Sequence, residues 1–183
     1  APTKRMTADE AETYHAEQME TLSQTDADLV SAFTLCYPEE AIGIVRAGKR
    51  FEMPVAIAFT VETDGRLPTG MSLKEAIETV DDAAGGAAAY FLINCAHPDH
   101  FSGVLADEPW IQRLRGVVAN ASRCSHAELD GSEELDEGDP GELGDLVGAL
   151  CKKFPHFTVV GGCCGTDMRH LQRIVEQVQT TLA

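Results

Sequence analysis

FTVVGGCC, residues 157–164, and AAYFLINC, residues 88–95, are two short apolar runs that both end in cysteine. Neither run alternates between apolar and polar residues, which is typical of strands buried on both faces of a parallel sheet. Three further runs have the same character: residues 28–35, 54–61 and 116–121. Helical segments separate these runs, so the sequence predicts an α/β fold of about five strand–helix units, organised as one domain over residues 1–183.

Helix signals fill the intervals between the strands. Thr7 and Ser72 are each followed three residues later by a glutamate, which is the capping box that starts a helix. These boxes predict helices over residues 7–22 and 73–84, and the two glycines that follow end the second one. Further helices are expected over residues 39–49, 142–154 and 167–182. A helical stretch is expected at 109–114, and an acidic loop at 122–140.

Two α/β architectures accommodate five parallel strands. A doubly wound sheet needs about five or six strands, and the strand pattern by itself slightly favours it. A (β/α)8 barrel needs eight strands, so this chain would supply only part of one. The cysteines favour the partial barrel, because Cys95 and the pair at 163–164 end strands that are two apart. A closing barrel brings such strand ends within reach of one metal ion.

The composition excludes several classes of protein. The 30 acidic and 14 basic residues give a formal charge of −16, which repels phosphate backbones, so no nucleic-acid partner is expected. No apolar run approaches the roughly 18 residues of a membrane span, and the polar N-terminus lacks the apolar centre of a signal peptide. We therefore expect a cytoplasmic protein with reduced thiols and no membrane contact. The first residue is alanine, which indicates processing or a longer chain.

Six cysteines in a chain without a secretory signal indicate metal binding or catalysis more than disulfides. Cys95, Cys163 and Cys164 are the candidates, because the C-terminal ends of parallel strands share one face, where active sites lie. Thiolates select Zn²⁺, and three protein ligands leave one position open, as in catalytic zinc sites. The other cysteines are expected to be packing or surface residues: Cys36, Cys124 and Cys151.

The chemistry of such a site favours alkyl transfer to sulfur. A zinc ion lowers the pKa of a bound substrate thiol, and three anionic protein sulfurs keep the bound sulfur nucleophilic. His97 and His100 follow Cys95 closely, and we interpret them as capping or solvated residues. The alternative is that they are additional metal ligands or hydrogen-bond partners of the ligands. Three further histidines have no clustered partners and are assigned no role: His126, His156 and His170.

Residues 93–98 (INCAHP) and 161–167 (GGCCGTD) resemble the homocysteine S-methyltransferase family. The family consists of zinc-dependent (β/α)8 barrels in which the Asn-Cys motif ends strand six and the Gly-Gly-Cys-Cys motif ends strand eight. The resemblance implies that Cys95, Cys163 and Cys164 hold Zn²⁺, with the sulfur of homocysteine as fourth ligand and methionine as product. It also implies a partial barrel of about five units, corresponding to strands four to eight.

The same resemblance implies which residues contact the substrate and which strands of the barrel this sequence lacks. Asn94, Thr34, Asn120 and Gly162 are expected to contact the substrate, and turn formation is an equal alternative for the two asparagines. Phe33 stands where many members carry a glutamate that holds the amino group, which puts homocysteine itself in question. Nothing matches the first three barrel strands, so we expect self-association or a missing N-terminal segment.

Three functions therefore compete. The first is methyl transfer to homocysteine or a related thiol from a donor such as a sulfonium compound, betaine or methylfolate through cobalamin. The second is a truncated, catalytically inactive zinc-binding remnant or a subunit of a methyltransferase. The third, a doubly wound redox protein that uses Cys163 and Cys164, is disfavoured because the sequence has no Cys-x-x-Cys motif.

Overall fold

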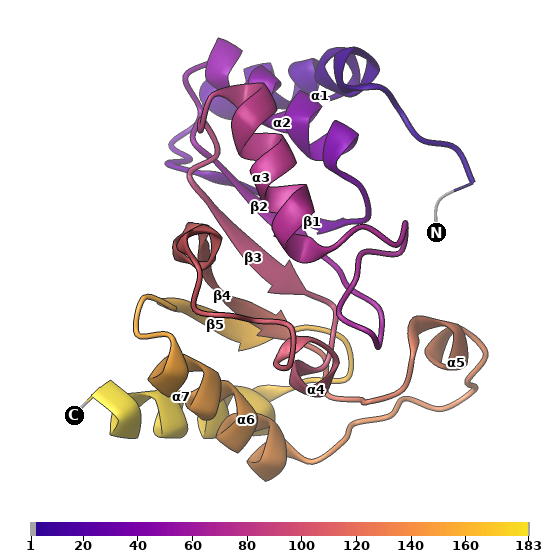
Figure 1. The fold of residues 1–183 in the computed structure, drawn as a ribbon, viewed down its shortest axis with the longest axis vertical. Helices are drawn as coiled ribbons and strands as arrows, with labels where there is room; N and C mark the ends of the chain where they lie inside the picture. Colours follow the sequence, from indigo (N-terminus) through magenta and orange to yellow (C-terminus); the bar gives the residue numbers. More distant parts are fainter. Residues whose placement is uncertain (1–2, 183) are drawn as a thin grey trace.

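Five parallel strands form one sheet, ordered β1-β2-β3-β4-β5, in the computed structural model, which describes residues 3–182 (Figure 1). The strands are β1 (Val30–Leu35), β2 (Val55–Phe59), β3 (Tyr90–Asn94), β4 (Leu114–Ala119) and β5 (Val159–Gly162). The helices are α1 (Ala8–Ser23), α2 (Pro38–Arg50), α3 (Leu73–Ala84), α4 (Pro98–Phe101), the 3-10 helix η1 (Pro109–Arg113), α5 (His126–Asp130), α6 (Pro140–Lys153) and α7 (Met168–Leu182). Each crossover joins neighbouring strands, as in a barrel and unlike a doubly wound sheet, whose strand order reverses.

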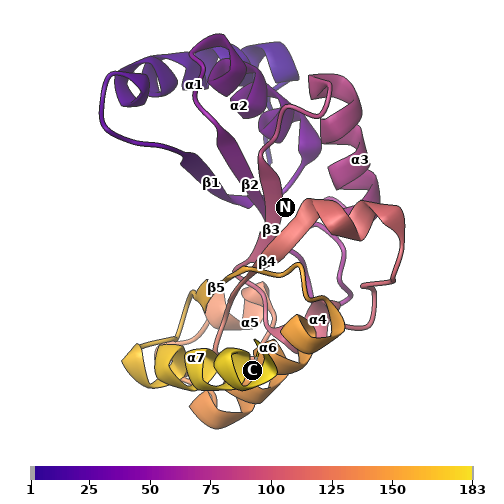
Figure 2. The same cartoon turned by 90° about the vertical axis from the view of Figure 1, so that its left-hand side faces the viewer.

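The sheet curls into an open arc. Figure 2 shows a C-shaped section with the long helices on its outer side and no helix layer on its inner side. Within the described residues, β1 pairs with β2 alone and β5 with β4 alone, so the two ends of the arc do not meet. The prediction of a partial (β/α)8 barrel is confirmed, and the doubly wound alternative is excluded. The single-domain organisation over residues 1–183 stays a prediction.

Local signals placed most element ends correctly. The Thr7 and Ser72 hydroxyls accept hydrogen bonds from the backbone N–H groups of Glu10 and Glu75, both at 3.2 Å, so both predicted capping boxes are present. Gly85 ends α3 in the left-handed conformation, with φ 65°. The short helices α4 and α5 were missed, because one turn of helix produces no periodic pattern.

Burial depends on the place of each strand in the arc. Every residue of β2 is buried, as expected for a central parallel strand. The expectation of burial on both faces is wrong for β1 and β5: Phe33 is 47% exposed, and all four residues of β5 are only half-buried. Each end strand has one neighbour instead of two, and its inner face is uncovered, so its apolar composition exceeds what this chain buries.

The core fills the space between the sheet and the outer helices. The rings of Phe59 and Phe91 stack there with centroids 6.2 Å apart, and both side chains are fully buried. Ile57, Ile93 and Val117 extend the same layer across β2, β3 and β4. Burying one such side chain contributes about 1.5–3 kcal/mol, so this layer fixes the positions of the strand ends that carry the site.

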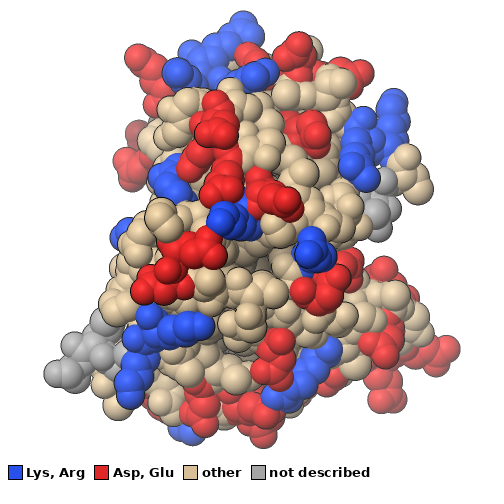
Figure 3. Space-filling view, in the orientation of Figure 1, with Lys and Arg blue, Asp and Glu red and all other residues tan. Residues whose placement is uncertain are grey.

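The surface is acidic, with both signs of charge mixed. Figure 3 shows Asp and Glu side chains over much of one face, interspersed with Lys and Arg, and gathered around α5. Among the described residues, no helix combines the length and the apolar composition that crossing a bilayer requires.

Candidate metal centre

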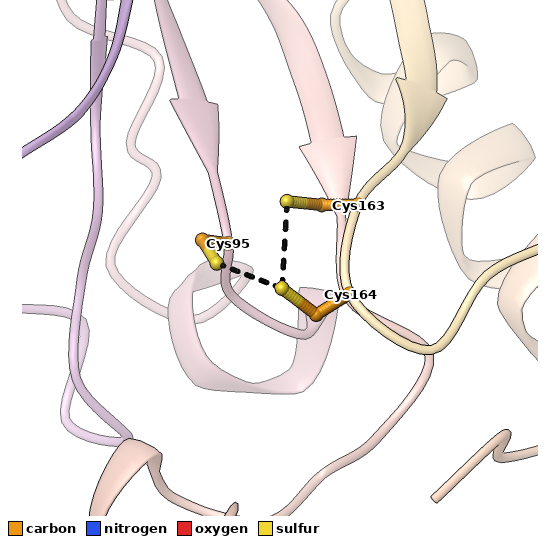
Figure 4. A group of neighbouring side chains, drawn as sticks. All are labelled: Cys95, Cys163 and Cys164. Carbon is orange, nitrogen blue, oxygen red and sulfur yellow. Dashed lines mark hydrogen bonds between the residues drawn. The ribbon is translucent and has the colours of Figure 1, made fainter. Parts of the chain in front are cut away.

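Three cysteine thiols come together at the C-terminal edge of the sheet. Cys95 directly follows β3, and Cys163 and Cys164 directly follow β5, so the side chains meet across the end of β4 (Figure 4). The Sγ atoms of Cys95 and Cys164 are 3.4 Å apart, and those of Cys163 and Cys164 are 3.9 Å apart. All three Sγ atoms lie within 4.8 Å of one another. The structure thus gathers the three residues that the sequence indicated.

Two of the three Sγ–Sγ spacings are close to those between ligands of a tetrahedral metal ion. Sulfur ligands at about 2.3 Å from a zinc ion lie about 3.8 Å from each other. The two Sγ–Sγ distances of 3.4 and 3.9 Å bracket this value. Thiolates are soft ligands that favour zinc over hard cations such as Mg²⁺. The donor set therefore fits a zinc ion with a fourth corner left for another ligand.

The end of β4 holds the turn that carries the cysteine pair. The backbone N–H of Cys163 donates to the carbonyl of Ala119 at 2.7 Å, and that of Ala121 donates to the carbonyl of Cys164 at 3.0 Å. The N–H of Cys164 donates to the Oδ1 atom of Asn120 at 3.2 Å. Asn120 therefore lies beside the thiols and supports a turn, while its contact with a substrate stays a prediction.

Cys95 has a left-handed backbone conformation, with φ 56°. In a residue other than glycine such a conformation costs about 1–3 kcal/mol, and strained residues cluster at functional sites. His126 Nε2 lies 2.7 Å from the carbonyl oxygen of Cys95. The sequence analysis assigned His126 no role, because 31 positions separate the two residues and no periodic pattern connects them.

The thiols perturb the ionisation of one another. The hydrogen bond from Cys95 is the largest influence that lowers the pKa of Cys163, to about 5, and Cys164 and Asn94 add to it. The same hydrogen bond, together with burial, raises the pKa of Cys95. Like charges this close repel, so ionisation of one thiol disfavours ionisation of its neighbours. A divalent cation would remove this repulsion, and its binding would release the remaining protons.

Asn94 connects β3 with β1. Its Oδ1 atom accepts from the N–H of Thr34, and its Nδ2 atom donates to the hydroxyl of Thr34, both at 2.8 Å. Asn94 is buried, and Thr34 has a positive φ of 62°. The two predicted substrate-contact residues are thus bonded to each other near the thiols, next to the exposed Phe33, and their contacts with a substrate stay predictions.

The absence of a side chain at Gly162 leaves space for the side chain of Thr166. A Cβ atom at this position would lie 2.3 Å from the hydroxyl oxygen of Thr166, and that hydroxyl donates to the carbonyl of Cys163 at 2.7 Å. A Cβ atom at Gly161 would meet nothing closer than Val118 at 3.7 Å. The backbone is therefore more open at Gly161 than at Gly162. The predicted contact of Gly162 with a substrate stays a prediction.

The other candidate residues lie outside the thiol cluster. Cys151 is buried in α6, Cys124 is exposed and Cys36 is half-buried. The Nδ1 atom of His97 accepts from the N–H of Asp99 at 3.3 Å at the start of α4, which confirms the capping interpretation. Burial lowers the pKa of His97 to about 4, so this side chain is neutral near pH 7.

A pocket of about 100 Å³ adjoins Cys164. Its lining residues are Ser122, Leu129, Glu134, Leu135, Asp136, Cys164 and Gly165. Most of them belong to the loop between β4 and α6, which therefore forms the outer wall of the site. The sequence predicts this loop but no function for it, because its acidic composition is typical of a solvated surface.

An arc of parallel βα units with three cysteine thiols at its C-terminal edge defines a barrel-type α/β protein with a candidate metal centre. The sequence model of one family, described as Homocysteine S-methyltransferase, matches residues 1–178. The chain therefore belongs to the homocysteine S-methyltransferase family.

A solved structure shows the same fold. The homocysteine methyltransferase MmuM from Escherichia coli, in its apo form, aligns with a TM-score of 0.64 and 16% sequence identity. The alignment covers 97% of this chain and 60% of that chain, so this chain spans about 60% of the length of the solved protein. No curated protein matches this sequence.

Proposed function

We propose that this chain acts in the transfer of a methyl group to the thiol of homocysteine, or of a related small thiol, with Zn²⁺ held by Cys95, Cys163 and Cys164. The observation that carries the proposal is the approach of the three thiols to 3.4 and 3.9 Å at the C-terminal edge of the sheet. Membership of the family supports the substrate class. With homocysteine as acceptor, the product is methionine.

Methyl transfer requires an activated acceptor thiol and fixed positions of the cysteines that hold the metal. When bound, Zn²⁺ lowers the pKa of a thiol and keeps its sulfur nucleophilic. The acceptor thiol loses its proton to solvent and a bond forms between its sulfur and the methyl carbon. The bond between that carbon and the donor breaks, and its electron pair stays with the donor. Asn120 and the end of β4 keep Cys163 and Cys164 in place. The pocket beside Cys164 is a place for the rest of the acceptor.

The identity of the acceptor depends on Phe33. Its side chain has no charge with which to bind an ammonium group, and 47% of it is exposed on β1. Related thiols therefore belong in any assay beside homocysteine. Sulfonium compounds, betaine and methylfolate are the donors to be tested first.

A second candidate is a zinc-binding subunit or an inactive remnant, and the open arc favours it. A partner is expected to cover the free edges of β1 and β5 and the uncovered inner face of the sheet. This partner is either a second copy of the chain or a barrel segment outside this sequence. We expect the isolated chain to self-associate. A stable monomer in light scattering would contradict this expectation.

The first test measures acceptor binding apart from turnover. In protein loaded with Co²⁺ in place of Zn²⁺, homocysteine should strengthen the sulfur-to-cobalt charge-transfer absorption, whereas homoserine, which has oxygen in place of sulfur, should not. Methionine formation with each donor is then followed by mass spectrometry, with Cys163→Ser as the control. Thiol binding without turnover would favour the subunit or remnant. The absence of any response to thiols would refute the proposal.

A further inference from the structure

The carbonyl oxygen of Cys95 has two hydrogen-bond donors. His126 Nε2 lies 2.7 Å from this oxygen, and the hydroxyl of Thr60 donates to it at 3.4 Å. On the other side of the residue, the N–H of Cys95 donates to the carbonyl of Val118 at 3.2 Å. These contacts fix both peptides of a residue whose φ of 56° is unfavourable for any side chain with a Cβ atom. Because the backbone sets the direction of the side chain, they also determine where the sulfur points.

Glu62 orients the ring of His126. The second ring nitrogen, Nδ1, lies 3.2 Å from the Oε2 atom of Glu62, which follows β2 in the chain. The two side chains are about one-third exposed, so the pair lies at the rim of the site. A carboxylate and a carbonyl are both acceptors, so the doubly protonated ring donates to both at once and the neutral ring donates to one of them. A chain of contacts thus runs from Glu62 through His126 to the backbone of Cys95.

The loop that carries His126 is itself fixed. His126 is the first residue of α5, and the N–H of Glu128 donates to the hydroxyl of Ser125 at 3.3 Å, while the N–H of Ser125 donates to the carboxylate of Glu128 at 2.8 Å. The same loop also packs on the other thiol-bearing turn, because a Cβ atom on Gly165 would lie 2.5 Å from the carbonyl oxygen of Asp136. Residues 122–139 therefore contact both Cys95 and the turn that carries Cys163 and Cys164.

We propose that His126 is a positioning residue for the metal centre, oriented by Glu62 and holding Cys95 in the conformation that directs its sulfur toward Cys164. The inference rests on the proposed function, because it takes the three thiols as metal ligands. Hydrogen-bond partners behind metal ligands change metal affinity by about 10–100-fold. His126 acts on the backbone of a ligand, so its effect should be expressed in the geometry of the site as well as in its affinity.

Three variants separate this role from a structural one. His126→Phe keeps a ring and removes the donor, His126→Gln retains a terminal amide N–H that reaches the position of Nε2, and Glu62→Ala leaves the ring without its orienting partner. His15→Phe is the matched control, since His15 pairs with Glu40 at 3.4 Å between α1 and α2. Zinc affinity is measured by competition with a chelator, and site geometry is measured from the absorption of the Co²⁺ form.

We expect His126→Phe to bind zinc about 10–100-fold more weakly and to shift the cobalt bands. His126→Gln should restore most of the affinity, Glu62→Ala should lie between the two, and the control should equal the unmodified protein. Equal affinity and equal spectra for His126→Phe, or equal losses for His126→Phe and His126→Gln, would overturn the inference and leave the metal centre standing. Failure of the unmodified protein to bind any metal would overturn the proposed function, and this inference with it.

Discussion

Replacing Gly116 by alanine should separate β4 from β5 and thereby disturb the thiol cluster. Gly116 has a φ of 155° and pairs with Val159 across the two strands. It lies in a bulge: Phe91 and Ile93 of β3 face Leu114 and Val117 of β4, so β4 carries one extra residue. A Cβ atom on Gly116 would lie 1.7 Å from the carbonyl oxygen of Val159. No side-chain rotation relieves this contact, because the backbone fixes the position of a Cβ atom and the carbonyl is itself part of the backbone.

The cost follows from this geometry. Overpacking in a closely packed region costs about 1–3 kcal/mol, and the strand separation needed to relieve it would break one or two hydrogen bonds worth about 1 kcal/mol each. The free energy of unfolding should therefore fall by about 2–5 kcal/mol, which lowers Tm by roughly 4–20 °C for a chain of this size. The cluster should also weaken, because Cys163 and Cys164 follow β5 whereas Cys95 follows β3.

Thermal unfolding followed by circular dichroism measures this effect, and Gly161→Ala serves as the control. Its Cβ atom would meet Val118 at 3.7 Å, an ordinary contact on the same pair of strands. We expect the control to melt within a few degrees of the unmodified protein and to keep its zinc. If Gly116→Ala melts as high as the control, the described pairing of β4 with β5 is wrong.

Three further predictions test the core, the strand connection and a buried histidine. Ile57→Ala, at a fully buried position of β2, should lower the free energy of unfolding in urea by about 2–5 kcal/mol, and a loss well below this range would contradict the packing against the outer helices. Asn94→Ala removes both hydrogen bonds to Thr34 and should cost about 1–3 kcal/mol in the same assay, whereas an unchanged stability would show that these bonds contribute nothing. In metal-free protein, burial lowers the pKa of His97 from 6.5 to about 4. Between these pH values the unfolded chain therefore binds a proton at His97 that the folded chain does not bind. Its contribution to stability is complete above about pH 6.5 and falls by about 3 kcal/mol as the pH drops to about 4; the His97→Gln variant should lack this part of the slope, and an equal slope in both proteins would refute the assignment.

Local signals sufficed to predict the α/β class and the three thiols, whereas the choice of a partial barrel over a doubly wound sheet came from the positions of the cysteines and from the family resemblance. The apolar runs and capping boxes are encoded in neighbouring residues, so the strands and the ends of α1 and α3 could be predicted. The cysteines directly follow two strands, and parallel strands present their C-terminal ends on one edge, so their meeting could also be predicted.

Contacts between distant residues could not be predicted in the same way. His126 and Cys95 are separated by 31 positions, and Asn94 and Thr34 by 60, and no periodicity connects them. The left-handed conformation of Cys95 leaves no trace in composition, since cysteine is not a residue that favours it. The exposure of β1 and β5 depends on the number of strands in the arc, which the residues of a single strand do not record.

Metal content of the purified, reduced protein tests the central claim most directly. We predict about one zinc ion per chain, as expected for a site with three cysteine ligands, with the metal lost in Cys163→Ser and retained in Cys124→Ser, whose thiol is exposed and lies outside the cluster. No zinc in the unmodified protein, or an equal zinc content in Cys163→Ser, would contradict the account.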